Sequence, residues 1–506
     1  MSTTTDLTSL RQRKAPLALA PDEFRRIGHR LVDAIADRLA QLPNGPVTRA
    51  ESAEAVRAAL DADRTLPASG VDPDQLVREA TELVFDHSLF NGHPRFFGYI
   101  TSSPAPIGMF GDFLAAAANQ NMGAWTLAPM AVEIERQVIR WIAELIGFPT
   151  DAGGLLVSGG NTANFVGFLA ARAAKAPWDV RKDGLAGLGR RLLVYASAET
   201  HTWIQKAADE FGLGTDAIRW IETDADQRMN SSALQRRIER DRAEGAQPFL
   251  VVGTAGSVST GAVDPLEDIA AICRAHDLWF HVDGAYGALA AGVPGAPASL
   301  RAIGAADSVA VDPHKWLYAP LEAGCALVRD ASALRRAFSY HPAYYHFGDD
   351  LTNYNEYGPQ NSRGFRALKV WLGLRQVGRS GCLAMIGDDI RLARHLFDLL
   401  AHHPEFEAAS QHLSITTFRY VPPDLRPELG STRVEDYLNR LNQDLLTAVE
   451  RSGEAFLSNA VLGGAFLLRT CIVNFHTSLE DIEALPPLLS RLGRAADAAL
   501  RRVLPV

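Results

Sequence analysis

The stretch Asp307-Ser308-Val309-Ala310-Val311-Asp312-Pro313-His314-Lys315-Trp316 is the part of the chain from which its fold can be inferred. It opens with a short apolar run, typical of a buried strand, and closes on a lysine between a histidine and a tryptophan. A lysine at the end of a buried strand is partly desolvated, which favours the neutral amine that Schiff-base chemistry requires. A lysine that simply points into solvent is the alternative that this stretch alone leaves open.

Four more apolar runs of the same kind lie upstream. The predicted strands are Leu155–Val157, Leu192–Ala196, Phe249–Gly253, Trp279–Val282 and, within the stretch above, Val309–Val311. Because these runs are nearly all apolar and are separated by helical patterns or loops, they predict an α/β domain whose mostly parallel sheet is buried on both faces. In such sheets, ligands bind at the carboxyl ends of the strands.

A carboxylate follows one of these strands in Trp279-Phe280-His281-Val282-Asp283-Gly284-Ala285-Tyr286-Gly287. The small residues after Asp283 would let a flat ring approach the backbone. A pyridoxal cofactor needs an acidic group on its pyridine nitrogen, because the protonated ring is the better electron sink. An aspartate that caps a helix is the alternative for this motif alone.

Two further motifs follow strands on the same predicted edge. Leu155-Leu156-Val157-Ser158-Gly159-Gly160-Asn161-Thr162-Ala163-Asn164 enters a helix through two glycines, and the free N–H groups of such a helix start can hold a phosphate. The motif is not GxGxxG and the chain has no Walker sequence, which argues against NAD and ATP. His201, after the Leu192–Ala196 strand, could stack on a cofactor ring or transfer a proton, although most loop histidines are structural or solvated.

The order of these four motifs resembles the pyridoxal-5′-phosphate-dependent group II decarboxylases, the family of aromatic-amino-acid and glutamate decarboxylases. The segments Asn91–Tyr99, Trp125–Glu135 and Ser362–Lys369 also match, and the similarity runs from about residue 20 to the C-terminus. The resemblance implies the type I pyridoxal-phosphate fold and conversion of an L-amino acid to its amine and CO₂.

The resemblance also implies roles for individual residues. Lys315 would carry pyridoxal 5′-phosphate as a Schiff base, Asp283 would pair with the ring nitrogen, His201 would stack over the ring and help position the substrate carboxylate, and Ala285 would lie against the opposite face. Gly160 and Asn161 would bind the phosphate, with Ser308 and His314 nearby. The family implies a homodimer with its active site at the interface, where Tyr99 and Ser102 would reach into the partner's site to contact substrate.

Two departures from the family leave residues unassigned. The strand-end sequence Thr254-Ala255-Gly256-Ser257-Val258 leaves the contact to the cofactor's 3-hydroxyl open between Thr254 and Ser257. The family's loop tyrosine, which would protonate the substrate Cα, corresponds to the segment Asp349–Gln360. The segment differs in length from the family's loop, so the alignment does not fix which tyrosine corresponds to the proton donor. We favour Tyr354 over Tyr357 for this role.

Several other functions are weighed against this one. The loop tyrosine argues against an aldehyde synthase, the absence of cysteine from residues 339–361 against a desulfurase, and the presence of both Lys315 and Asp283 against a non-catalytic protein. For the substrate, Phe96, Phe97, Tyr99 and Trp125 favour an aromatic amino acid, although aromatic clusters usually belong to a core. Glutamate, aspartate and diaminobutyrate are the alternative substrates.

Composition excludes other classes of partner. Of the 506 residues, 47% are hydrophobic and 22% charged, and 50 Lys and Arg against 59 Asp and Glu give a formal charge of −9. A mildly acidic chain without a long basic run disfavours nucleic acid and anionic membranes. Cys273, Cys325, Cys382 and Cys471 form no CxxC pair, so we expect buried reduced thiols and no metal site.

The chain is predicted to form three parts. These are a helical segment over residues 1–90 that packs on the dimer, a large cofactor-binding domain over 91–375, and a small α+β domain over 376–506 with a helix at Gly381–Ala401 and strands at Leu413–Val421 and Ala465–Phe475. The basic cluster Arg11, Arg13 and Lys14 precedes only six residues of apolar sequence, too few for a signal peptide. We therefore expect a cytoplasmic protein that does not cross a membrane.

Overall fold

The computed structural model describes residues 11, 13, 15–186, 189–340 and 351–504, so Lys14 of the basic cluster lies outside it. The chain divides into two compact units, Met1–Phe90 and Asn91–Val506. The first unit holds the helices α1 (Pro21–Gln41), α2 (Ala53–Leu60) and α3 (Pro73–Asp86), which confirms the helical patterns read from the sequence. Helix α3 starts where it does because the Asp72 carboxylate accepts the N–H groups of Asp74 and Gln75.

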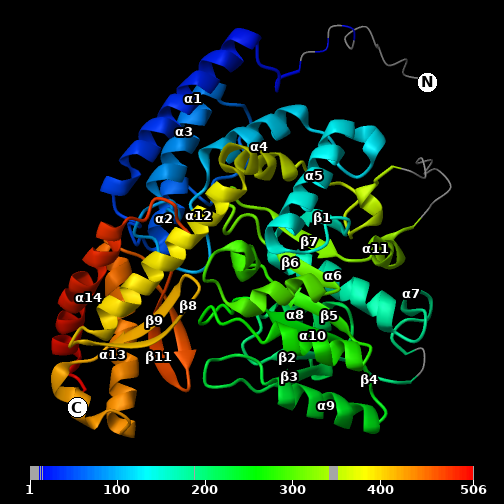
Figure 1. Ribbon diagram of the computed structural model, residues 1–506. Helices are drawn as coiled ribbons and strands as arrows, with labels where there is room; N and C mark the ends of the chain where they lie inside the picture. The colour runs from blue at the N-terminus through cyan, green and yellow to red at the C-terminus, as the bar shows by residue number, and fades with distance from the viewer. Residues whose placement is uncertain (1–10, 12, 14, 187–188, 341–350, 505–506) are drawn as a thin grey trace. The chain divides into compact units, whose positions relative to one another are not determined.

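The second unit is built around a seven-stranded sheet (Figure 1). Its strands are β1 (Gly153–Val157), β2 (Leu192–Ser197), β3 (Ile218–Ile221), β4 (Gln247–Thr254), β5 (Trp279–Asp283), β6 (Ser308–Val311) and β7 (Gly324–Val328). The strand order is β1-β7-β6-β5-β4-β2-β3. Strand β7 runs antiparallel to β1 and β6, and the other pairs are parallel. The predicted mostly parallel sheet is therefore confirmed.

Five of the seven strands of this sheet were predicted from the sequence. All residues of β1, β2, β5, β6 and β7 are buried, as a sheet covered on both faces requires. The five predicted strands correspond to β1, β2, β4, β5 and β6. Strands β3 and β7 were not predicted; β3 is a four-residue edge strand in which Trp220 is exposed, so it lacks a continuous apolar run.

Helices surround this sheet. They are α4 (Pro106–Ala118), α5 (Pro129–Ile146), α6 (Gly159–Lys175), α7 (Val180–Asp183), α8 (Trp203–Glu210), α9 (Ser231–Ala243), α10 (Leu266–Ala275) and α11 (Ala331–Phe338). Helix α6 packs across β1, β4, β5, β6 and β7. Strands β1 and β6 are both antiparallel to β7, so they run in the same direction. Because α6 begins directly after β1, its N-terminus lies at the carboxyl ends of the parallel strands.

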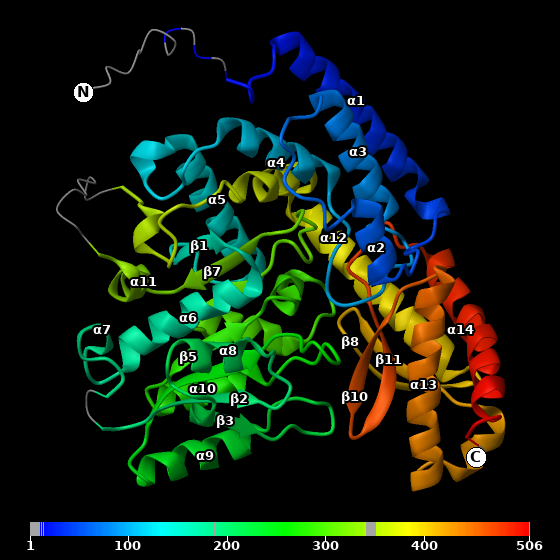
Figure 2. The same cartoon turned by 180° about the vertical axis from the view of Figure 1, so that it is seen from behind.

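A second sheet forms near the C-terminus. Its antiparallel order is β10-β11-β9-β8, made of β8 (Phe406–His412), β9 (Ile415–Tyr420), β10 (Ser458–Leu462) and β11 (Ala465–Cys471). The helices α13 (Thr432–Ser452) and α14 (Leu479–Leu500) lie side by side against it (Figure 2). The predicted strand at Leu413–Val421 is confirmed as β9, whereas β11 ends at Cys471, before the predicted Phe475.

The long helix α12 (Ala367–Ala401) begins well before the predicted Gly381. Gly378, at φ 64° and ψ 178°, interrupts its helical geometry, and a glycine adopts that conformation without the cost that a Cβ would add. The helix crosses residue 375, and the division of the second unit at that point stays a prediction. No helix in the described part of the chain is both long enough and apolar enough to cross a membrane.

Candidate active site

A pocket of about 230 Å³ lies at the carboxyl ends of the parallel strands. Seven of the predicted site residues line it: Gly160, Asn161, His201, Asp283, Ala285, His314 and Lys315. They come together because the strands before them are in register, with Asp283 opposite Ala310 in the β5–β6 pair. Side chains that follow two such strands must emerge at the same edge of the sheet.

Asp283 is held in place by a tryptophan that the sequence reading did not assign. The indole Nε1–H of Trp203 donates to Asp283 Oδ2 at 2.7 Å, and the Ala285 N–H donates to Oδ1 at 3.3 Å. Trp203 is fully buried at the start of α8, two residues after His201. Nothing in the sequence around His201 indicated that this indole would turn towards β5.

Lys315 lies in the turn that follows β6. Its ammonium Nζ is 2.9 Å from Asp312 Oδ2, and its side chain is 17% exposed. The neighbouring His314 donates from Nδ1 to the carbonyl oxygen of Ala323 at 2.7 Å, and burial lowers its pKa. The lysine side chain is therefore largely removed from solvent, in line with the expectation from the sequence, and it lies beside a carboxylate that the sequence did not predict.

The imidazole of His201 faces the same pocket. Desolvation lowers its pKa, and the nearby Asp283 carboxylate opposes that shift only in part. Its Nδ1 accepts the backbone N–H of Trp203 at 3.2 Å, which assigns the proton of the neutral ring to Nε2. His201 is thus a neutral imidazole with one N–H left to donate.

The start of α6 fits a phosphate group. The N-cap residue Ser158 makes no side-chain capping bond, so the first N–H groups of this 17-residue helix stay available. Gly159 has φ +80°, and a Cβ on Gly160 would lie 2.7 Å from Asp312 Oδ2 and 3.0 Å from the Ala285 Cβ. Glycine is therefore required at position 160 to keep the cradle open.

Ser308 does not belong to this pocket. As the first residue of β6 it lies at the amino end of the strand, whereas the pocket lies at the carboxyl end. Its buried hydroxyl accepts the Trp279 Nε1–H and meets His281 Nδ1, both at 2.7 Å. The phosphate contact expected of Ser308 is thus contradicted by the length of the strand.

Of the two candidates for the cofactor's 3-hydroxyl, Thr254 lines the pocket. The Ser257 hydroxyl is buried and is hydrogen-bonded to the Thr260 hydroxyl at 2.9 Å, and Ser257 is not among the lining residues. The position of Thr254 at the carboxyl end of β4 explains the difference.

The stretch after β-bridge residue Phe96 contacts the pocket of its own chain. Ile100 lines the pocket, and the Ser102 hydroxyl donates to the His314 carbonyl oxygen at 2.7 Å. Tyr99 is 61% exposed and its ring lies beside Phe456 instead. The expected reach of Tyr99 and Ser102 into a partner's site stays a prediction; within one chain, the Ser102 hydroxyl is engaged with His314 and Tyr99 is exposed.

Tyr354 is not brought to Lys315. Of the predicted loop Asp349–Gln360, the first two residues lie outside the described residues, and Tyr354 opens a short 3₁₀ turn, Tyr354–Glu356. Its side chain is 1% exposed, and the Arg363 guanidinium lies 4.7 Å from the ring centre. Burial raises its pKa well above the usual phenol value. A buried phenol outside the pocket is poorly placed to donate a proton there.

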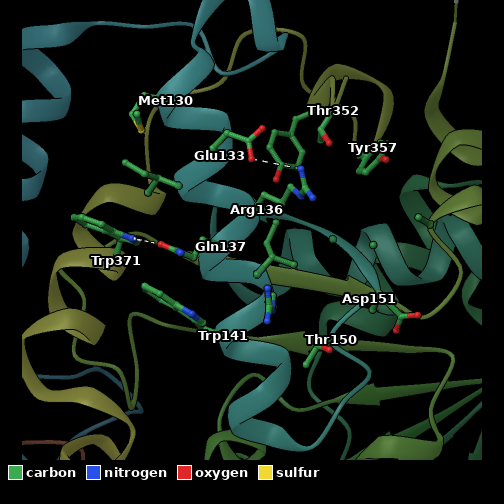
Figure 3. A pocket seen from close by; sticks show the side chains of 18 residues that line it. Met130, Glu133, Arg136, Gln137, Trp141, Thr150, Asp151, Thr352, Tyr357 and Trp371 are labelled. Carbon is green, nitrogen blue, oxygen red and sulfur yellow. Dashed lines mark hydrogen bonds and ion pairs between the residues drawn. The ribbon is translucent and has the colours of Figure 1, made fainter. Parts of the chain in front are cut away.

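Tyr354 and Tyr357 line a larger groove of about 1240 Å³ along α5 (Figure 3). Two pairs of its polar groups contact each other: the Trp371 Nε1–H donates to Gln137 at 2.7 Å, and Arg136 pairs with Glu133 at 3.4 Å. The residues that line it include no lysine. Its larger size would favour this groove as the active site. The convergence of buried reactive groups favours the Lys315 pocket instead.

Of the aromatic residues that suggested an aromatic substrate, Phe96 and Phe97 belong to the core. Phe96 stacks on Phe456 with ring centres 5.4 Å apart, and Phe97 is buried among the C-terminal core residues. The Trp125 indole donates to Glu133. Together with Tyr99, these residues are absent from the lining of the Lys315 pocket, so they carry no information about the substrate.

A lysine and a carboxylate at neighbouring strand ends, an imidazole above them and an uncapped helix start define a site of the pyridoxal-phosphate class. The chain belongs to the pyridoxal-dependent decarboxylases, since the model of the pyridoxal-dependent decarboxylase conserved domain matches residues 58–421. It is a pyridoxal-phosphate-dependent amino-acid carboxy-lyase with the type I fold.

Relatives and solved structures agree with this assignment. The chain is 34% identical over 473 residues to an aromatic-L-amino-acid decarboxylase of Bacillus atrophaeus, which covers 92% of this chain and 94% of the relative. Mouse CSAD in its apo form has a TM-score of 0.88 and 29% identity, covering 94% of this chain and 99% of its own. Oryza sativa TDC with PLP and tryptamine has a TM-score of 0.87 and 26% identity, covering 96% and 99%.

Proposed function

We propose that this enzyme converts an aromatic L-amino acid to its amine and CO₂, with Lys315 as the amine that holds the cofactor. The observation that carries the proposal is the convergence of Lys315 and Asp283 on one pocket at the uncapped start of α6. The aromatic class of substrate is supported by the aromatic-L-amino-acid decarboxylase of Bacillus atrophaeus, which is similar over nearly the whole chain.

Bound pyridoxal phosphate supplies an electron sink for the bond that breaks when CO₂ leaves. The protein's part is to hold the cofactor and to orient its ring. Asp283 would keep the ring nitrogen protonated, and the Trp203 hydrogen bond fixes the direction of its carboxylate. The α6 N-terminus at Gly160 and Asn161 would hold the phosphate, and Thr254 would contact the 3-hydroxyl. Ala285 would pack against one ring face and His201 against the other.

His201 is the proton donor that the described geometry supports best. Its Nδ1 is occupied by the Trp203 N–H, so Nε2–H is the proton free to reach the substrate Cα. A lowered pKa keeps the ring neutral and suits it to exchange a proton without carrying a fixed charge. Tyr354, the donor favoured from the sequence, is replaced in this proposal because its phenol is buried outside the pocket.

We further propose that the enzyme is a homodimer whose interface adjoins the active site. Helix α4 exposes Phe110, Phe113 and Leu114, each more than half accessible. A run of large apolar side chains on one helix is the surface expected of a subunit contact. Helix α4 begins shortly after Ser102, which touches His314, so a partner on this face would border the pocket. The helical unit Met1–Phe90 is proposed to pack on the same dimer.

A cytoplasmic location is part of the proposal. The four cysteines are all buried and free, as expected for a protein that works in a reducing compartment.

The experiment that tests the proposed reaction measures amine, aldehyde and CO₂ release for each of the twenty amino acids, ornithine and diaminobutyrate. We expect amine and CO₂ in equal amounts, with highest kcat/KM for an aromatic amino acid. Preference for glutamate, aspartate or diaminobutyrate would overturn the substrate class, and aldehyde as the main product would overturn the reaction. Light scattering of wild type and Phe113→Glu tests the interface, since the charge should convert dimer to monomer.

A further inference from the structure

The carboxylate of Asp312 lies at the rim of the proposed phosphate cradle. It is 2% exposed, its Oδ2 is 2.9 Å from Lys315 Nζ and 3.7 Å from His314 Nε2, and its Oδ1 is buried without a hydrogen-bond partner. The Gly160 position that a Cβ would take is 2.7 Å from Oδ2. The acid therefore touches both the lysine that would hold the cofactor and the helix start that would hold its phosphate.

This arrangement places two anions in one small pocket. A phosphate at the start of α6 would lie beside the Asp312 carboxylate. Two neighbouring negative groups in a buried site raise the pKa of the carboxyl, so the phosphate and Asp312 are not both ionised. The lysine raises a second conflict, because the ammonium that pairs with Asp312 is not a nucleophile, whereas attachment to an aldehyde requires the neutral amine.

Transfer of one proton resolves both conflicts. We propose that Asp312 takes a proton from Lys315 when the cofactor attaches, and then faces the phosphate as a neutral carboxylic acid. The inference rests on the proposed function and concerns a residue to which the sequence reading gave no role. The unpartnered Oδ1 is the oxygen available to the phosphate.

The step balances without an outside reagent. One proton passes from the Lys315 ammonium to the Asp312 carboxylate. The neutral amine then forms a carbon–nitrogen double bond with the aldehyde carbon, and the aldehyde oxygen leaves as water with the two remaining amine hydrogens. Nothing is oxidised or reduced.

The groups around Asp312 leave Lys315 as the proton source. Desolvation lowers the pKa of His314 in the same turn and of His201 in the loop after β2, so neither is a ready cation. The Cys325 thiol on β7 is fully buried and its pKa is raised, so it stays protonated. The acid at the other end of β6 differs: Asp307 accepts the Phe280 N–H at 2.8 Å and serves the backbone.

Infrared difference spectroscopy of the enzyme with and without pyridoxal phosphate tests the proposal directly. We expect the C=O stretch of a protonated carboxylic acid to appear on cofactor binding in the wild type and in Asp307→Asn, the matched control. The band should be missing from Asp312→Asn. Absence of the band from the wild type, or its survival in Asp312→Asn, would overturn the proposal.

The pH dependence of cofactor affinity gives a second readout, measured by cofactor absorbance. While Asp312 keeps the transferred proton in the complex, binding exchanges no net proton with solvent, so wild-type affinity should not change with pH. In Asp312→Asn the lysine proton must leave to solvent, so affinity should rise about tenfold per pH unit until the lysine of the free enzyme has lost its proton. Equal slopes in both proteins would contradict the inference.

The outcomes separate this inference from the proposed function. If borohydride reduction of the wild type leaves no pyridoxyl group on Lys315, the proposed function itself fails. If the label is present and the infrared band is not, only the role of Asp312 fails. Should Asp312→Asn not fold, Asp312→Ser takes its place, and the wild-type band remains decisive.

Discussion

The strand ends of β5 and β6 and the loop Asp349–Gln360 were both expected to supply catalytic groups, and Tyr354 of that loop lies in a different environment from the strand ends. Asp283 and Lys315 meet in one pocket because paired strands place their carboxyl ends together. Tyr354 instead lies in the core, against an Arg363 guanidinium that is ion-paired with Glu135. Backbone register fixes where the ends of β5 and β6 lie. The position of Tyr354 depends instead on the burial of its ring and on the Arg363–Glu135 ion pair.

The largest effect is expected at the strand ends. Lys315→Ala should reduce turnover below detection and leave no borohydride-reducible adduct, because the amine that holds the cofactor is gone. Peptide mass spectrometry after reduction of the wild type should find the pyridoxyl group on Lys315. The control is Lys206→Ala on the nearby helix α8, which should keep the label. A label on any other lysine in the wild type would contradict the site.

The second largest effect is expected on the stability of the fold, at the Arg363–Glu135 ion pair beside Tyr354. Arg363 is 1% exposed in its side chain and donates to Glu135, which is fully buried. Arg363→Met would leave that carboxylate buried without its cation, at a cost of about 3–5 kcal/mol in the free energy of unfolding. Urea denaturation measures it. Adding Glu135→Gln should recover part of the loss; no loss in the single variant would show that the ion pair does not hold this segment.

A partial loss of cofactor affinity is expected when Asp283 or its hydrogen-bond donor Trp203 is changed. Asp283→Ala should weaken cofactor binding about 10- to 100-fold, since a hydrogen bond to a charged group contributes about 1.5–3 kcal/mol. Trp203→Phe removes only the indole donor and should cost less. Titration of the apoenzyme with pyridoxal phosphate compares the two variants. If they are equal, or if Asp283→Ala binds like the wild type, Asp283 acts on the fold and not on the cofactor.

A pH-dependent effect is expected from the turn after Lys315. The buried Asp389 accepts the Trp316 Nε1–H at 3.0 Å and the Tyr318 hydroxyl at 2.8 Å, and desolvation raises its pKa to about 8. A raised carboxyl pKa gives stability that is full below the unfolded value of 3.8 and is lost as pH rises through about 8. Asp389→Asn should remove this loss. Melting temperatures of the two proteins measured from pH 6 to pH 9 should therefore separate as pH rises to about 8, with the wild type falling relative to the variant; parallel curves would refute the assignment.

The smallest effect is expected at Tyr354. Tyr354→Phe should keep amine as the product and change the free energy of unfolding by less than about 1 kcal/mol, because the ring and its packing remain. Product analysis under air makes the comparison with Tyr357→Phe. Aldehyde and peroxide from Tyr354→Phe would restore the donor favoured from the sequence and show that the segment moves during turnover.

The sequence predicted the chemistry where chemistry and backbone pattern coincide. Strand-end motifs at Gly160, His201, Asp283 and Lys315 were found because each follows a short apolar run, and parallel strands bring such ends together. Ser308 was misplaced for a related reason, since it belongs to the same motif as Lys315 but lies at the opposite end of the strand. Proximity along a strand is not proximity in a pocket.

The amino-acid sequence by itself determined the α/β class, the pyridoxal-phosphate site and the family, because these depend on local patterns that can be recognised without knowledge of the packing. Only the tertiary structure decided that Trp203 holds Asp283, that the Ser102 hydroxyl donates to the His314 carbonyl, and that Asp312 pairs with Lys315 at the helix start. It also decided that Phe97 and Tyr354 are core residues. The physical reason is that side-chain partners are chosen by packing between elements distant in sequence, for which a single chain carries no local signal.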